Sequence, residues 1–254
     1  MADKTSVWVE VRPHAERLLQ LVSDSPPTGE FEIPTAHAYI AGMFWRARRL
    51  YEGVLLLLKA ELPEEAAFLA RSLFEEGLRL QQLATEPENR DALILYWANA
   101  SISQQQGLME TAKASGLDPD ISEVSAALEE RRRNLQEYAV RHGVKRRRQF
   151  QTVRDAAFRF GRKEDFWTYQ WAHESVHGSD AMWLFARRKR GVDTVALHAK
   201  TNDPEVLSGF AHVAAKSMAE AADAAFTIFG WTAAPEFQQV VSDIERVLDS
   251  DKRP

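Results

Sequence analysis

The sequence predicts an all-α protein, built as a single-domain bundle of roughly eight to ten helices. Apolar residues recur at helical spacing along most of the chain. Glycine is scarce, with 12 among 254 residues, and the 10 prolines stand mostly at the ends of the periodic segments. A chain of this length can bury one substantial core, so we expect one domain over residues 1–254.

The helices follow from these boundaries in chain order. Thr35 suits the N-cap of a helix, Pro63 suits a first helical turn, and Gly143 suits the position after a helix end. The segment 191–202 is either a short strand or a loop. The expected helices cover residues 7–23, 35–58, 63–83, 87–115, 119–142, two or three shorter stretches within 150–190, then 203–229 and 235–248.

The helix over 203–229 is expected at the centre of the bundle. Small side chains let neighbouring helices approach closely, and this segment is rich in alanine. A basic elbow at 143–148 then separates two halves of one bundle rather than two domains. The alanines of the central helix are Ala211, Ala214, Ala215, Ala219, Ala221, Ala222, Ala224 and Ala225.

The composition excludes several classes of protein. No cysteine is present, so disulfides, cysteine-ligated metal centres and thiol nucleophiles are excluded. Residues 1–12 carry charges and no long apolar run, unlike a signal peptide. The most apolar stretch, 54–58, is far shorter than the about 20 residues of a membrane span. We therefore expect a cytoplasmic protein with no membrane partner.

Two segments hold the first candidate site. Arg71 and Glu75 lie four residues apart, and thus on one face of a helix. Tyr169, His173 and His177 follow one another at the same spacing, which aligns a hydroxyl with two imidazoles. Imidazole is the side chain most readily tuned for proton transfer near neutral pH. The structural alternatives are a salt bridge at the edge of the core and a polar helix end.

These two segments resemble the bacterial domain-of-unknown-function family numbered 5677. The resemblance spans residues 39–186 and rests on the stretches 70–75 and 169–179. Members of that family look like helical bundles, and no chemistry is assigned to them. The resemblance implies that the two segments meet in space. The positions that match the family pattern are Arg71, Glu75, Tyr169, Ser175 and His177, while His173 is not part of it.

The stretch from His173 to His177 also matches the zinc motif H-E-x-x-H. On a helix this motif places two imidazoles on one face, with Glu174 as a general base toward a metal-bound water. Zinc peptidases of this kind usually place a sheet beside the motif, and no strong strand precedes it here. Zinc at His173 and His177 is therefore an alternative, and no other cofactor is expected. A third ligand would have to come from His198, Glu205, His212 or Glu220.

A strongly basic segment lies in the middle of the chain. Twelve lysines and arginines stand against two acidic residues between positions 131 and 163, although the net charge of the chain is −5. Such clusters are typical of phosphate-backbone binding. Nearby aromatic residues suit base stacking, namely Phe150, Phe158, Phe160, Phe166 and Trp167. The structural alternative is a solvated face balanced by acidic helices. The arginines assigned to nucleic acid are Arg146, Arg147, Arg148, Arg159 and Arg162.

Together these patterns predict a protein that binds or cleaves RNA or another phosphate-rich partner, in stress or phage defence. Arg71 would hold a phosphate, Glu75 would orient Arg71, and His177 would shuttle protons in a catalytic cluster that includes Tyr169. One alternative is a metal-dependent hydrolase, and another is a non-catalytic protein-interaction module. The sequence leaves open whether the protein is an enzyme, and the bundle architecture suggests a homodimer.

Overall fold

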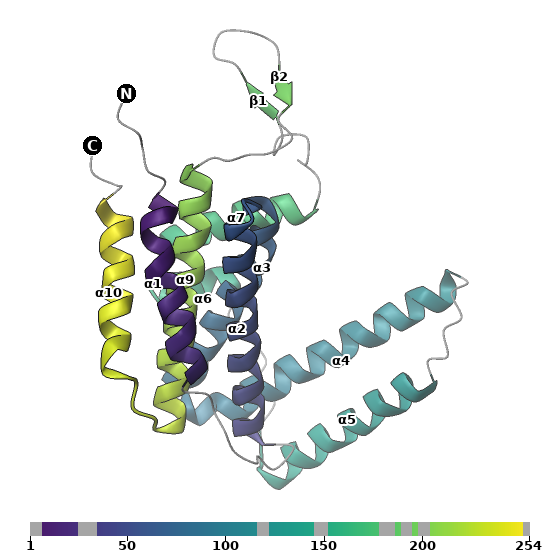
Figure 1. The fold of residues 1–254 in the computed structure, drawn as a ribbon. Helices are drawn as coiled ribbons and strands as arrows, with labels where there is room; N and C mark the ends of the chain where they lie inside the picture. Colours follow the sequence, from purple (N-terminus) through teal and green to yellow (C-terminus); the bar gives the residue numbers. More distant parts are fainter. Residues whose placement is uncertain are drawn as a thin grey trace, which may run out of the picture. The chain divides into compact units, whose positions relative to one another are not determined.

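The computed structural model confirms the all-α prediction. It describes residues 7–24, 35–115, 122–144, 152–177, 186–188, 195–197 and 204–250. Nine α-helices lie in these residues (Figure 1). The strands in the same residues are β1 (Ala186–Arg188) and β2 (Val195–Leu197), an antiparallel pair in which Arg187 faces Ala196. The segment predicted as strand or loop therefore contains a short strand.

The chain forms two compact helical units. The first contains Met1–Thr28, Gly42–Ala84 and Gln151–Pro254, and the second contains Gly29–Ala41 and Thr85–Phe150. A single domain over residues 1–254 stays a prediction. None of the helices in the described residues combines the length and the apolar character needed to cross a membrane.

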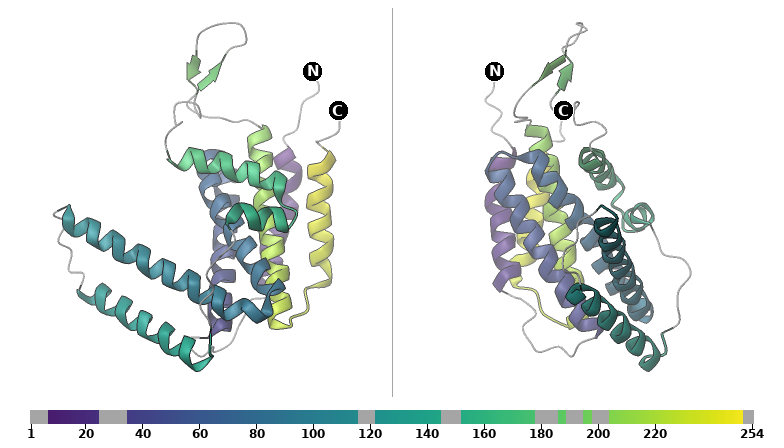
Figure 2. Two further views of the ribbon diagram at one scale, coloured as in Figure 1. Left: turned by 180° about the vertical axis from the view of Figure 1, so that it is seen from behind. Right: turned by 90° about the vertical axis from the view of Figure 1, so that its right-hand side faces the viewer.

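The first unit is a bundle with an alanine-rich helix in its interior. Helix α1 packs against α9 and α10, as the views in Figures 1 and 2 agree. Helix α7 packs against α6 and α9. The helices of this unit are α1 (Val7–Asp24), α2 (Ala36–Lys59) from Gly42 onward, α3 (Pro63–Thr85), α6 (Val153–Arg159), α7 (Lys163–His177), α9 (Pro204–Phe229) and α10 (Pro235–Ser250). All eight alanines predicted for the central helix are buried in α9.

The second unit pairs two long helices. Helix α4 (Arg90–Ala114) packs against α5 (Ser122–Arg141), and the Tyr138 hydroxyl donates a hydrogen bond of 2.6 Å to Asp91 Oδ1. The apolar seam between the two helices consists of Leu95, Ala98, Ile102, Leu128, Leu135 and Tyr138. Much of the predicted basic segment lies in this unit, on α5 and on residues beyond 144 that are outside the described part.

Local signals set the helix ends, with one correction. Thr35 Oγ1 accepts a 3.2 Å hydrogen bond from the backbone N–H of Ala38, which confirms the predicted cap. Gly143 has a φ of 60°, the left-handed conformation that glycine adopts after a helix end. The helix predicted over 87–115 begins with a different geometry from the one expected. Pro87–Asn89 forms a 3₁₀ turn, closed by a 3.0 Å bond from Asn89 N–H to Glu86 O, and α4 begins only at Arg90.

Helices α3 and α9 approach closely at a glycine. A Cβ atom added to Gly77 would lie 3.0 Å from the carbonyl oxygen of Ser217, a backbone atom that cannot move aside without shifting its helix. By contrast, a Cβ added to Gly209 on α9 meets no atom within 4 Å. Packing therefore requires glycine at position 77. At position 209 packing sets no such requirement, and a substitution there changes stability only through helix propensity.

Gly77→Ala should lower the free energy of unfolding by about 1 kcal/mol, because overpacking outweighs the gain in helix propensity. The matched control Gly209→Ala should raise it by up to about 1 kcal/mol, because alanine restricts the unfolded chain and nothing clashes. Urea denaturation followed by circular dichroism measures both. Equal stabilisation by the two substitutions would contradict the close approach of α3 and α9.

Candidate functional site

Three of the four predicted catalytic residues converge where α7 crosses α3. Arg71 Nη2 lies 3.3 Å from Glu75 Oε1, and the Tyr169 hydroxyl donates a 3.0 Å hydrogen bond to the same oxygen. The Arg71 guanidinium also lies over the Tyr169 ring, 5.4 Å from its centroid. The two segments thus meet, as the resemblance implied.

An apolar wall fixes Tyr169 in this cluster. Its ring stacks on Phe166 at a centroid distance of 5.6 Å and lies 5.4 Å from the ring of Phe74. Burial raises the pKa of the Tyr169 hydroxyl, and the negative charge of Glu75 raises it further. Tyr169 therefore stays protonated and acts here as a hydrogen-bond donor.

Arginines surround the carboxylates of α3. The second oxygen of Glu75 lies 3.7 Å from Arg79 Nη2, and Oε1 of the buried Glu76 lies 3.1 Å from Arg46 Nη1. The side chains of Arg71 and Glu75 keep 23% and 21% of their surface exposed. The Nε of Arg71 is buried without a hydrogen-bond partner among the described residues. Arg46 of α2 and the two α3 arginines therefore stand beside two glutamates, and the exposed part of Arg71 is a cation that an anion can reach.

The remaining predicted residues of α7 are placed by their backbone alone. The H-E-x-x-H stretch lies entirely within α7, which ends at His177, so the helical spacing assumed for it holds. Position 177 stands two turns beyond Tyr169. The side chains of His173, Ser175 and His177 lie outside the described part, so their catalytic and metal roles stay predictions.

Arg162, which the sequence assigned to nucleic-acid binding, is buried in the core instead of lying on the surface. Arg162 is 1% exposed, and its guanidinium is held by Asp165 and Glu220 and lies over the Phe74 ring at 5.0 Å. An arginine in this position has no exposed face for a phosphate backbone, so Arg162 belongs to the core. Arg159 is exposed on α6 and lies over the Phe160 ring at 5.5 Å. Arg146, Arg147 and Arg148 lie outside the described residues.

A second polar cluster, which the sequence interpretation missed, adjoins Arg162. Asp165 Oδ1 lies 3.3 Å from His212 Nε2, and Asp165 Oδ2 lies 3.4 Å from Lys216 Nζ. The signal for it was present in the sequence. His212, Lys216 and Glu220 recur every fourth residue within an alanine-rich helix, which puts them on one face.

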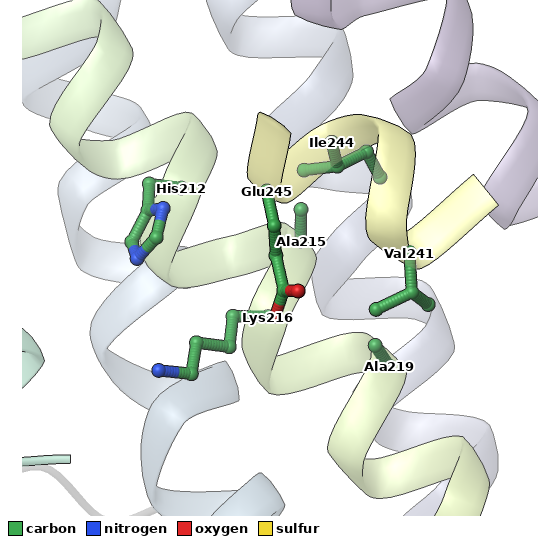
Figure 3. A pocket seen from close by; sticks show the side chains of 7 residues that line it. All are labelled: His212, Ala215, Lys216, Ala219, Val241, Ile244 and Glu245. Carbon is green, nitrogen blue, oxygen red and sulfur yellow. The ribbon is translucent and has the colours of Figure 1, made fainter. Parts of the chain in front are cut away.

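This cluster borders a pocket between α7, α9 and α10. The pocket has a volume of about 290 Å³ and is lined by Gly161, Lys163, Glu164, Asp165, His212, Lys216 and Glu245. Figure 3 shows a smaller adjoining pocket, in which His212, Lys216 and Glu245 lie beside apolar residues of α9 and α10. His212 and Lys216 therefore reach solvent, with 22% and 31% of their side-chain surface exposed.

The Asp165 carboxylate is held in its charged form. Burial by itself would raise its pKa, but the hydrogen bond from His212 and the charges of Arg162 and Lys216 outweigh that effect. The net result is a pKa well below the ordinary value of 3.8. For Glu220, the opposite balance holds, because burial raises its pKa more than Arg162 and Lys216 lower it.

Comparison with known protein families gives a match. A family described as "Family of unknown function (DUF5677)" matches residues 37–191. No curated protein and no solved structure matches the chain. The matched segment contains Arg71, Glu75 and Tyr169, whereas His212 and Lys216 lie beyond it.

Tyr169→Phe should lower the free energy of unfolding by about 1 kcal/mol, because it removes the hydrogen bond to Glu75 and keeps the stacked ring. Urea denaturation at pH 7 measures the change. An unchanged midpoint would mean that the hydroxyl exchanges this bond for water without cost.

Asp165→Asn should lower the free energy of unfolding at neutral pH by about 3 kcal/mol, because it leaves a buried arginine short of one carboxylate. The folded pKa of Asp165 lies below its unfolded value, so this contribution is complete above pH 3.8 and is lost as the pH falls further. Urea denaturation at several pH values should show a constant gap between wild type and variant from pH 7 to 5. The gap should narrow below about pH 4, and a gap that widens on acidification would contradict this assignment.

Proposed function

Because the chain belongs to the family of unknown function DUF5677, which assigns no chemistry to it, we propose a function from its own surface. We propose that it is a cytoplasmic protein that binds single-stranded RNA through α6 and the start of α7. The observation that carries the proposal is a surface where exposed aromatic rings alternate with exposed cations. We call it the α6–α7 surface; it consists of Arg154, Phe158, Arg159, Lys163 and Trp167.

The two aromatic side chains of the α6–α7 surface are exposed to solvent. Trp167 keeps 65% of its surface exposed and Phe158 keeps 42%. Burying such rings normally contributes to stability, so their exposure indicates a surface that contacts something else. Flat rings in a basic environment bind single-stranded nucleic acid by stacking on its bases.

The cations of this surface are arranged around Phe158. The guanidinium of Arg154 lies 5.5 Å from the centre of the Phe158 ring, and Lys163 Nζ lies 5.8 Å from it. Two acidic residues are close by, but the Asp155 carboxylate caps the N-terminus of α6 by accepting from Thr152. Glu164 stands in the first turn of α7, where the helix dipole offsets its charge.

The Arg71 cluster supplies a second contact within the same unit. Phe158 meets Phe166 edge to face at 6.1 Å, and Phe166 stacks on Tyr169, so one aromatic row connects the α6–α7 surface to the Arg71 cluster. We expect Arg71, oriented by Glu75, to bind a phosphate of the same strand. The acid–base role of His177 and the link to stress or phage defence remain predictions from the sequence.

The test is fluorescence anisotropy with a labelled 12-nucleotide single-stranded RNA. Phe158→Ala and Trp167→Ala should each raise Kd by roughly 5- to 100-fold, because each removes a stacking partner. The matched control is Phe68→Ala on α3, since Phe68 is 40% exposed and lies outside the α6–α7 surface. It should leave Kd unchanged.

Replacing Arg154, Arg159 and Lys163 together with glutamine should reduce the slope of log Kd against log salt by up to about 2, because each lost phosphate contact contributes about 0.7. Failure of the RNA to bind at 50 mM salt would refute the proposal. Equal effects of Phe158→Ala and Phe68→Ala would also refute it, and a protein-interaction surface would then be the better interpretation of the exposed rings.

A further inference from the structure

We propose that Asp165, His212 and Lys216 form an acid–base site that cleaves the bound RNA by attack of a ribose 2′-hydroxyl. This inference rests on the proposed RNA binding and adds a reaction to it. It concerns the pocket between α7, α9 and α10, to which the family match assigns no chemistry.

The first step of the argument is the orientation of His212. Its Nε2 lies 3.3 Å from Asp165 Oδ1, and Asp165 is only 5% exposed. A buried carboxylate that accepts from one ring nitrogen fixes the tautomer, so the proton sits on Nε2 and Nδ1 keeps its lone pair. His212 is therefore arranged as a general base, with Asp165 as its positioning residue.

Asp165 is itself held in position by the buried Arg162. The buried Arg162 guanidinium contacts both Asp165 and Glu220, and its Nη2 donates to Ser217 Oγ at 3.2 Å. Positioned in this way, Asp165 can orient His212 without a change of rotamer when a substrate enters. Catalytic groups need such a rigid supporting shell.

Lys216 supplies the second chemical group. It stands one turn after His212 on the same face of α9, and its Nζ lies 3.4 Å from Asp165 Oδ2. An ammonium at this place can neutralise the charge that develops on a phosphoryl group and can donate a proton to a leaving oxygen.

The pocket suits part of an RNA strand rather than a free polyanion. Its volume of about 290 Å³ is at the lower end of small-molecule sites, enough for one sugar and its phosphate. Glu164, Asp165 and Glu245 line it together with Lys163 and Lys216, so the lining does not attract anions by itself. Affinity must come from outside the pocket, and Lys163 belongs both to its lining and to the α6–α7 surface.

The reaction balances without a cofactor. His212 Nδ1 takes the proton of the 2′-hydroxyl, the 2′-oxygen forms a bond to phosphorus, and the bond from phosphorus to the 5′-oxygen breaks. The 5′-oxygen takes a proton from the Lys216 ammonium. The proton on His212 and the vacancy on Lys216 then exchange with water. The products are a 2′,3′-cyclic phosphate and a 5′-hydroxyl.

The test incubates the full chain with the same 12-nucleotide RNA in EDTA and follows cleavage by gel and mass spectrometry. We expect products ending in a 2′,3′-cyclic phosphate, and no cleavage of the same sequence made with 2′-deoxyribose. His212→Gln should lower the rate by about 10²- to 10⁴-fold while Kd for RNA stays unchanged. Lys216→Met should lower the rate as well.

The matched control is His14→Gln, purified in the same way. His14 also stands beside a carboxylate, with Nδ1 at 4.0 Å from Asp243 Oδ2, and does not line the pocket. It should cleave like wild type. Asp165→Asn should reduce the rate of single-turnover cleavage with little change in Kd, measured at a temperature where circular dichroism shows the variant to be folded. If Asp165 were only structural, the folded variant would cleave at the wild-type rate.

Several outcomes would overturn the inference. RNA that binds and stays intact would refute the cleavage site and leave the proposed binding function standing. Cleavage that survives His212→Gln, or that is lost in His177→Ala but not in His212→Gln, would place the chemistry elsewhere. RNA that does not bind at all would refute the proposed function, and this inference with it.

Discussion

The buried guanidinium of Arg162 is the interaction on which the first unit depends. It contacts Asp165 at the start of α7 and Glu220 on α9, and it lies over the ring of Phe74 on α3. A buried charge costs several kcal/mol unless it is paired, so the three helices are held in the one arrangement that satisfies it. Such a network gives little net stability, but it strongly disfavours other packings of α7.

This fixed start of α7 determines where both polar clusters lie. Asp165 points its carboxylate at α9, where it meets His212 and Lys216. One turn later, Tyr169 reaches Glu75 on α3. Because residues four apart share a face of a helix, a single docking of α7 positions both the pocket and the Arg71 cluster. A shift of α7 would therefore disturb the two clusters together.

The fold was largely predictable from the sequence, whereas the site was predictable only in part. Helix boundaries depend on local signals such as Thr35 and Gly143, and these are readable residue by residue. The pairing of Arg71 with Glu75 is also local, since it lies within one helix. The contact between Glu75 and Tyr169 was predicted only through the family resemblance, because no local signal in the sequence links residues almost a hundred positions apart. Arg162 was misassigned for the same reason, since a basic run does not reveal which of its members turns inward to distant carboxylates.

The net charge of −5 is compatible with RNA binding because electrostatic attraction is local. At physiological salt the Debye length is about 8 Å, so charges farther away than this are largely screened from a bound strand. The affinity for an RNA strand therefore depends on the cations in direct contact with it and on the rings on which its bases stack. Burying Arg162 removes one cation from that set, but it also fixes α7, and α7 carries Lys163 and Trp167 at the surface. In the proposed function, the interior arginine would contribute to RNA binding by positioning the exposed residues rather than by touching the RNA.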